Sequence, residues 1–107
     1  MATLLLLFCL EEIISHRVAD PPLGIRIERV VLISLEDGMA VLEVRGRYRN
    51  LETRAQKFRL ILTRGREELG KSNGYLSGEG KDSFAVSVRI RVPSDNLRGV
   101  RAQIEFY

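Results

Sequence analysis

Nucleophilic catalysis needs a nucleophile with a base beside it, and that base is usually a histidine. The chain has 107 residues with a single histidine, His16, and a single cysteine, Cys9. These two side chains also fall short of the three or four protein ligands that a zinc ion takes. We therefore expect Cys9 to be a small buried apolar side chain and His16 to be a surface residue.

Four carboxylates gather in and beside the glycine-rich stretch 65–80, namely Glu67, Glu68, Glu79 and Asp82. They could bind a divalent cation, but their spacing lacks the pattern of a calcium loop. We therefore prefer the interpretation that these four carboxylates keep the turns soluble. The glycines of the same stretch match no phosphate-binding loop. We predict that the chain is not an enzyme and that it uses no metal and no cofactor.

Arginine supplies most of the positive charge, with 14 arginines against three lysines. The formal net charge is only +3, because 14 acidic residues are interspersed among the basic ones. A planar guanidinium suits carboxylates and phosphates alike, so arginine content does not by itself choose between ion pairs and nucleic acid. The interspersed acidic residues favour exposed ion pairs.

Some of these arginines recur at every second residue of predicted strands, which places them on one outer face if the strands are neighbours. This predicted basic face comprises Arg45, Arg47, Arg49, Arg89, Arg91 and Arg101. Phosphates or an acidic protein could bind there. However, Glu43 and Glu105 share the outward faces, and aromatic side chains for base stacking are lacking. Pairing of arginine with glutamate across strands is therefore preferred, with nucleic-acid binding as the alternative.

The N-terminal residues 1–20 differ from the rest of the chain. Residues 3–10 form an apolar run that is too short to span a bilayer. No basic residue precedes the run and two glutamates follow it, unlike a signal peptide. Helix-tolerant residues predict an α-helix from Thr3 to Val18, which Pro21 and Pro22 end. We therefore predict a helix within 1–20 and a β-domain over 21–107.

The first turns of this predicted helix are apolar on nearly every side. Leu4, Leu5 and Phe8 lie on the side that becomes polar in the second half. Packing on the chain's own sheet is the simplest expectation, but it covers only one face of a helix and leaves apolar surface uncovered. We predict that these three residues form an assembly surface. A second copy of the chain, a different protein and a membrane surface are the partners that fit this assembly surface.

Alternation of apolar with polar residues begins after Gly24 and predicts β-strands. The strands expected from this pattern cover residues 25–35, 39–49, 58–62, 84–92 and 100–106. The sequence Glu36-Asp37-Gly38 predicts a tight turn between the first two. The stretch 65–80 is expected to hold loops and one or two short edge strands.

Six or seven strands, each with one polar face, predict a mainly β fold. The expected architecture is an antiparallel two-sheet, immunoglobulin-like sandwich behind the N-terminal α-helix. A parallel sheet is not expected, because no helix-length crossover lies between the strands. A small barrel of the OB type is the alternative, because periodicity does not reveal strand order.

Residues 42–92 resemble immunoglobulin-like sandwich modules of the FxLYD and water-stress-domain type. The resemblance rests on residues 44–50 (VRGRYRN), on the alternating strand 58–62 (FRLIL), and on a Gly-Glu turn at 76–79 (LSGE) before 84–88 (FAVSV). It implies a non-catalytic module, commonly exported or membrane-tethered, that binds or spaces other proteins. It implies no catalytic residues.

The leading hypothesis is a non-enzymatic interaction or structural module that assembles or attaches through its apolar N-terminal helix. A nucleic-acid-binding module that uses the predicted basic face is the alternative. A third hypothesis is a small enzyme subunit that has no active site of its own. A membrane-associated or extracytoplasmic location is slightly favoured over a cytoplasmic one.

Overall fold

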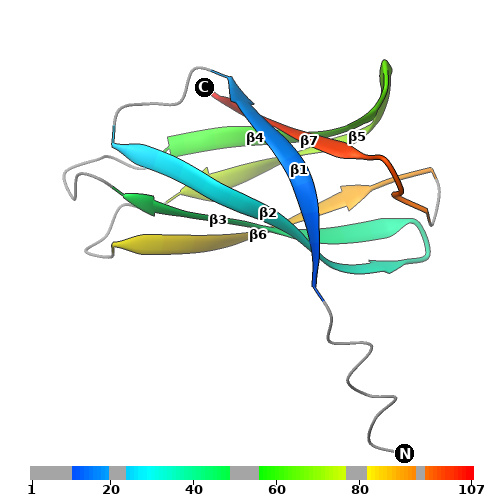
Figure 1. Cartoon of the computed structure of the whole chain (residues 1–107), viewed down its shortest axis with the longest axis horizontal. Coiled ribbons are helices and arrows are strands. Elements are labelled where there is room, and N and C mark those ends of the chain that lie inside the picture. The colour runs from blue at the N-terminus through cyan, green and yellow to red at the C-terminus, as the bar shows by residue number, and fades with distance from the viewer. Residues whose placement is uncertain (1–10, 20–23, 49–55, 77–81, 94–95) are drawn as a thin grey trace, which may run out of the picture.

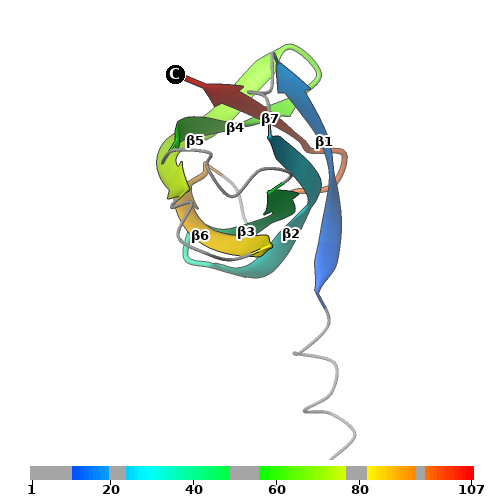
Figure 2. The same ribbon diagram turned by 90° about the vertical axis from the view of Figure 1, so that its left-hand side faces the viewer.

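The computed structural model describes residues 11–19, 24–48, 56–76, 82–93 and 96–107. Seven strands in these residues form one mixed sheet that curls into a nearly closed shape (Figures 1 and 2). The strands are β1 (Glu12–Ala19), β2 (Ile25–Glu36), β3 (Met39–Tyr48), β4 (Gln56–Arg64), β5 (Glu67–Leu76), β6 (Ser83–Arg91) and β7 (Arg101–Phe106). The described part is therefore mainly β, as predicted.

The strand order is β5-β4-β7-β1-β2-β3-β6, with β1 at its centre. Residues 12–14 of β1 pair with β2 in antiparallel orientation. Residues 15–19 of the same strand pair with β7 in parallel orientation. β1 thus joins an antiparallel half, β2-β3-β6, to a second antiparallel half, β7-β4-β5.

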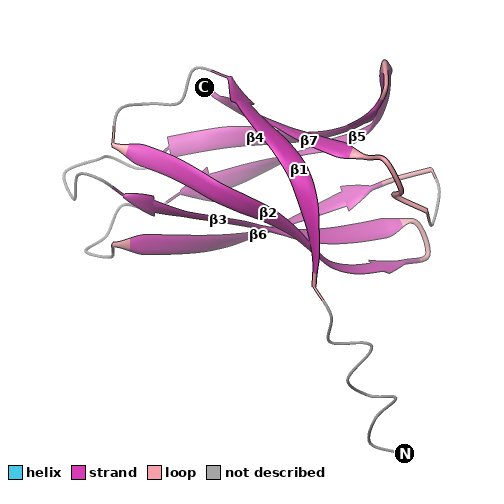
Figure 3. Ribbon diagram, in the orientation of Figure 1, coloured by secondary structure: helices cyan, strands magenta, loops and turns pink. Residues whose placement is uncertain are grey.

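The helix predicted from Thr3 to Val18 is wrong over its second half, where the structure has β1 (Figure 3). Ile14 is buried opposite Val30, while Ile13 points outward, so this segment alternates with the period of a strand. Residues that tolerate a helix form a strand here because β2 and β7 both offer backbone hydrogen bonds. Residues 1–10, with Cys9 and the first half of the predicted helix, lie outside the described residues.

The expectation of purely antiparallel pairing is also wrong, because β1 and β7 run parallel. No helical crossover is needed, since all five other strands lie between these two in the chain. The predicted division into two packed sheets is not confirmed, because β1 makes the two halves one continuous sheet. The number of strands agrees with the six or seven expected.

The core lies inside the curled sheet and follows the predicted alternation. The side chains of Phe58, Leu60 and Leu62 on β4 are completely buried, as are Leu42 and Val44 on β3. On β6 the predicted inward residues Val88 and Ile90 are buried, and Phe84 and Val86 pack against the core from its edge.

The strand β2 keeps its apolar side inward by means of two irregularities. The register of β2 on β3 shifts between Ile27 and Arg29, and again between Leu32 and Ser34. Each shift adds one residue to β2, as in a β-bulge, so Val30 and Leu32 remain inside after the first. The first shift also turns Ile33 outward, where it is 40% exposed, and the second returns Leu35 to the inner side.

The two edge strands, β5 and β6, approach each other and nearly close the sheet. β5 turns small residues inward: Gly70 faces Leu62 and Gly74 faces Phe58 in the register. A Cβ on Gly70 would overlap the backbone oxygen of Arg91 on β6, and one on Gly74 would overlap the Phe58 ring. The stretch 65–80, expected to hold loops and one or two short edge strands, instead contains one edge strand of ten residues, and its glycines permit the close approach.

We predict that Gly74→Ala destabilises the fold by about 1–3 kcal/mol, because the added methyl group must displace the buried Phe58 ring. Urea unfolding measures this change. Lys71→Ala, on the exposed face of the same strand, is the control and should change stability by less than about 0.5 kcal/mol. In the double variant Gly74→Ala with Phe58→Leu, the loss of stability should be smaller than the sum of the losses in the two single variants. Full additivity would show that the ring is not what the methyl group meets.

Candidate functional site

The outer surface of β3 carries a small network of ion pairs. Arg45 Nη2 lies 2.8 Å from Glu11 Oε1, and Arg45 Nε lies 2.5 Å from Glu43 Oε1. Arg47 Nε lies 3.4 Å from Glu28 Oε1. Two members of the predicted basic face are therefore neutralised by carboxylates of β2, β3 and the residue before β1. The preferred interpretation, pairing of arginine with glutamate, holds for these two.

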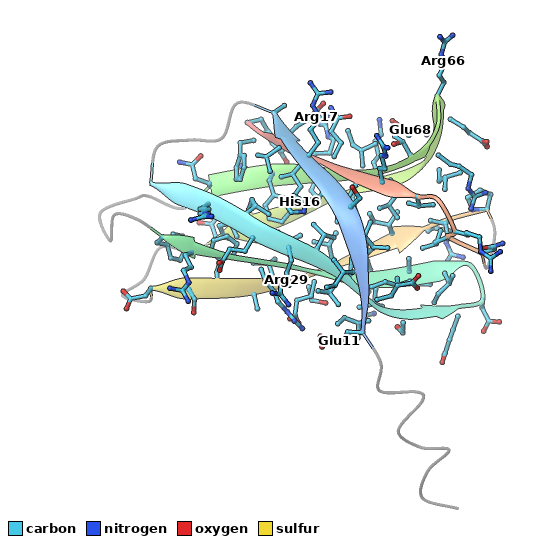
Figure 4. All side chains as sticks on the ribbon, in the orientation of Figure 1. Glu11, His16, Arg17, Arg29, Arg66 and Glu68 are labelled. Atoms are coloured by element: carbon cyan, nitrogen blue, oxygen red, sulfur yellow. The ribbon has the colours of Figure 1, made fainter. Side chains whose placement is uncertain are left out.

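The network changes the acidity of Glu11. The hydrogen bond from Arg45 lowers the pKa of the Glu11 carboxyl, and the charges of Arg45 and Arg29 act in the same direction. The hydrogen bonds to Glu11 and Glu43 correspondingly raise the pKa of Arg45. All of these groups are at least partly exposed to solvent, so the pairs orient the side chains more than they stabilise the fold. Figure 4 shows Glu11 at the start of β1, below Arg29 on β2.

The other arginines of the predicted basic face lie in two places. Arg89 and Arg91 are exposed on β6, opposite Val41 and Met39 of β3. They share the outer face of Arg45 and Arg47, because all four occupy alternate positions of paired strands. Arg49 lies outside the described residues.

Acidic residues adjoin the β6 arginines as well. A shallow hollow is lined by Arg89, Arg91, Met39 and the neighbouring carboxylate residues Glu36 and Asp37 of the β2–β3 turn. Positive and negative side chains therefore alternate over this face, and no uninterrupted basic stripe crosses its described residues.

Arg101 does not belong to this face. It is the first residue of β7, which lies between β4 and β1 on the other half of the sheet. Its neighbours in the register are Ser15 on β1 and Thr63 on β4. The predicted face of six arginines is therefore split by the strand order, which periodicity does not reveal.

Apolar side chains lie on the outer surface where β1 meets β2. Ile13 is 65% exposed and is paired in the register with Val31, which is buried at 1% exposure but lies outside the main core cluster. Ile33 follows on the same strand and is 40% exposed. Sequence analysis missed this surface, because Ile13 was assigned to a helix and Ile33 is displaced by a bulge. The sequence signal that could have indicated a strand here was the alternation of Ile14, His16 and Val18 with the polar residues Ser15 and Arg17.

The predicted assembly residues Leu4, Leu5 and Phe8 lie outside the described residues. They precede β1 directly in the chain, so the apolar run 3–10 leads to the exposed Ile13. Within the described ranges, no helix has the length and hydropathy required to cross a bilayer.

His16 lies on β1 opposite Ala102 of β7 and is half-buried (Figure 4). In the part of the chain that the structure describes, no three His, Cys, Asp or Glu side chains are grouped as metal ligands.

Comparison with known proteins found no family model, no curated protein and no solved structure that matches the chain. The resemblance of residues 42–92 to FxLYD-type modules therefore stays a prediction.

We predict that Arg45→Met raises the pKa of Glu11 toward its ordinary value of 4.5, because the main hydrogen-bond donor is removed. A carboxyl with a lowered pKa favours the folded state above pH 4.5, and this contribution is lost as the pH falls through the folded-state pKa. A pH titration by NMR measures the pKa of the Glu11 carboxyl in the native protein and in Arg45→Met. Arg29→Met should give a smaller rise, and Arg47→Met none. An unchanged Glu11 pKa in Arg45→Met would refute the pairing.

Proposed function

We propose that the chain is a non-enzymatic interaction module that self-associates through the outer surface at the start of β1. The observation that carries the proposal is Ile13, an isoleucine that is 65% exposed and is separated from the apolar run 3–10 by Glu11 and Glu12. With Ile33, which is 40% exposed, it places apolar side chains on the outer surface of β1 and β2. A surface of this kind, bordered by charges, is typical of a protein-binding patch.

The charges around Ile13 favour a second copy of the chain as the occupant. Glu11, Glu43 and Arg45 lie beside it, and Arg29 is close enough to lower the pKa of Glu11. A two-fold interface brings one patch against itself, so a patch with both signs can pair carboxylates of one copy with arginines of the other. An anionic membrane would attract the arginines but repel the carboxylates.

We also propose that the sheet functions as an immunoglobulin-like module with two layers. The support is that β2-β3-β6 and β7-β4-β5 are each antiparallel and share one core, with β1 as the only hydrogen-bonded link between the two described halves.

We predict that the full-length protein forms dimers or larger assemblies and that Ile13→Glu weakens association at least about tenfold, because a carboxylate would be buried in the interface. Size-exclusion chromatography with light scattering over a concentration series measures this. Tyr75→Glu is the matched control, since Tyr75 is 55% exposed on the edge strand β5. A full-length protein that is monomeric at every concentration would refute the proposal.

Removal of residues 1–10 tests the contribution of the apolar run and leaves β1 intact. Removal of the first 20 residues would delete the central strand of the sheet, so loss of assembly would then not be informative. We expect the shorter deletion to remain folded by circular dichroism and to associate more weakly. Binding of the full-length monomer to phosphatidylcholine–phosphatidylglycerol vesicles would favour the membrane instead of a second copy.

Nucleic-acid binding is the second candidate, favoured by the placement of Arg89 and Arg91 on the strand next to Arg45 and Arg47. For this candidate we predict that Arg89→Glu with Arg91→Glu abolishes binding to a fluorescent oligonucleotide, and that native binding weakens steeply with salt. Fluorescence anisotropy measures both. The absence of binding by the native protein at low salt would eliminate the candidate.

A further inference from the structure

A hollow of about 230 Å³ lies on the outer surface where β1, β7 and the end of β4 meet. Two arginines, two hydroxyl side chains and one amide line it, together with His16, Gly65 and Ala102. The arginines are Arg17 and Arg101, the hydroxyls are Ser15 and Thr63, and the amide is Gln103. Among the described residues, no carboxylate lines the hollow.

The register of three strands brings these side chains together. Ser15 on β1, Arg101 on β7 and Thr63 on β4 form one row across the sheet. Arg17 and Gln103 form the next row on the same outer face. The parallel pairing of β1 with β7 therefore places Arg17 diagonally beside Arg101. Figure 4 shows Arg17 directed away from the interior of the sheet.

Both arginines of the hollow are exposed, and neither forms an ion pair with a carboxylate in the described ranges. This contrasts with Arg45 and Arg47 on the other half of the sheet. Two carboxylates lie near these arginines in the register: Glu105, diagonal to Arg17 on β7, accepts the hydrogen bond of Gln103, and Glu68, opposite Thr63 on β5, is exposed. Neither carboxylate forms an ion pair with Arg17 or Arg101. The two guanidinium groups therefore keep their donors for a ligand.

Neighbouring contacts hold the polar side chains in place. Gln103 Nε2 donates a hydrogen bond of 3.1 Å to Glu105 Oε1, which orients the amide. Arg64 donates a bond of 3.1 Å to the backbone oxygen of Arg98 and another to that of Asn96. These bonds hold the segment that leads into Arg101 against the end of β4.

We propose that this hollow binds a phosphate group, either free or carried by a small phosphomonoester. Guanidinium groups match the geometry of phosphate oxygens, and hydroxyl and amide groups supply further neutral donors. The volume lies below the range of 300–1,000 Å³ that is common for drug-sized ligands, so it suits a single phosphate group better than a whole nucleotide. The site is independent of the self-association proposed above, since Ile13 and Arg45 lie outside it.

The test is a titration of the full-length, isotope-labelled protein with inorganic phosphate, followed by amide NMR shifts. We expect saturable shifts confined to residues 15–17, 63–65 and 101–103. Arg101→Met and Arg17→Met should each weaken binding about tenfold or more, because each removes a charged hydrogen-bond donor. Arg89→Met is the control and should bind phosphate like the native protein. Native-like melting of each variant establishes that it is folded.

A parallel titration with glycerol 3-phosphate distinguishes the two sources of the phosphate group. Saturable binding of either compound supports the site, and the tighter one identifies the source. Titration with sodium chloride at matched ionic strength measures screening alone. The proposal is overturned if chloride reproduces the shifts, if they do not saturate with either compound, or if Arg17→Met and Arg101→Met both bind as tightly as Arg89→Met.

Discussion

Backbone hydrogen bonding on both edges of β1 is the constraint on which the rest of the structure depends. Residues 12–14 pair with the backbone of β2, and residues 15–19 pair with the backbone of β7. One short strand therefore covers an edge of each antiparallel half. Without β1, two edges with unpaired amide and carbonyl groups would face solvent. The segment 12–19 therefore adopts a strand although several of its residues tolerate a helix, and its pairing sets the positions of all seven strands.

The candidate surfaces follow from the same strand order. Because β1 changes partner between Ile14 and Ser15, its first residues face the outside of one half and its last residues the outside of the other. Ile13 consequently lies beside the ion pairs of β3, whereas Arg17 lies beside Arg101. The strand order thus separates an outer face of paired charges from one whose two arginines, Arg17 and Arg101, form no ion pair with a described carboxylate.

The sequence predicted the strands whose side chains alternate without interruption, and the inward residues of β4, β6 and β7 agree with the structure. It did not predict β1, since these eight residues after an apolar run are also compatible with a helix, and one of the two partners of the strand, β7, is remote in the chain. Exposure of Ile33 depends on a bulge, which alternation does not encode. Arg101 was grouped with Arg45 because periodicity tells which side a residue faces, but not which strands are neighbours.

The parallel orientation of β1 and β7 has a mechanical consequence. Both strands begin at the same end of the molecule, so the chain enters β1 at one end and leaves β7 at the opposite end (Figure 1). A pulling force applied at residues 11 and 107 would slide the two strands past each other along their length. All the backbone bonds between residues 15–19 and 101–105 would then be loaded together instead of opening one after another.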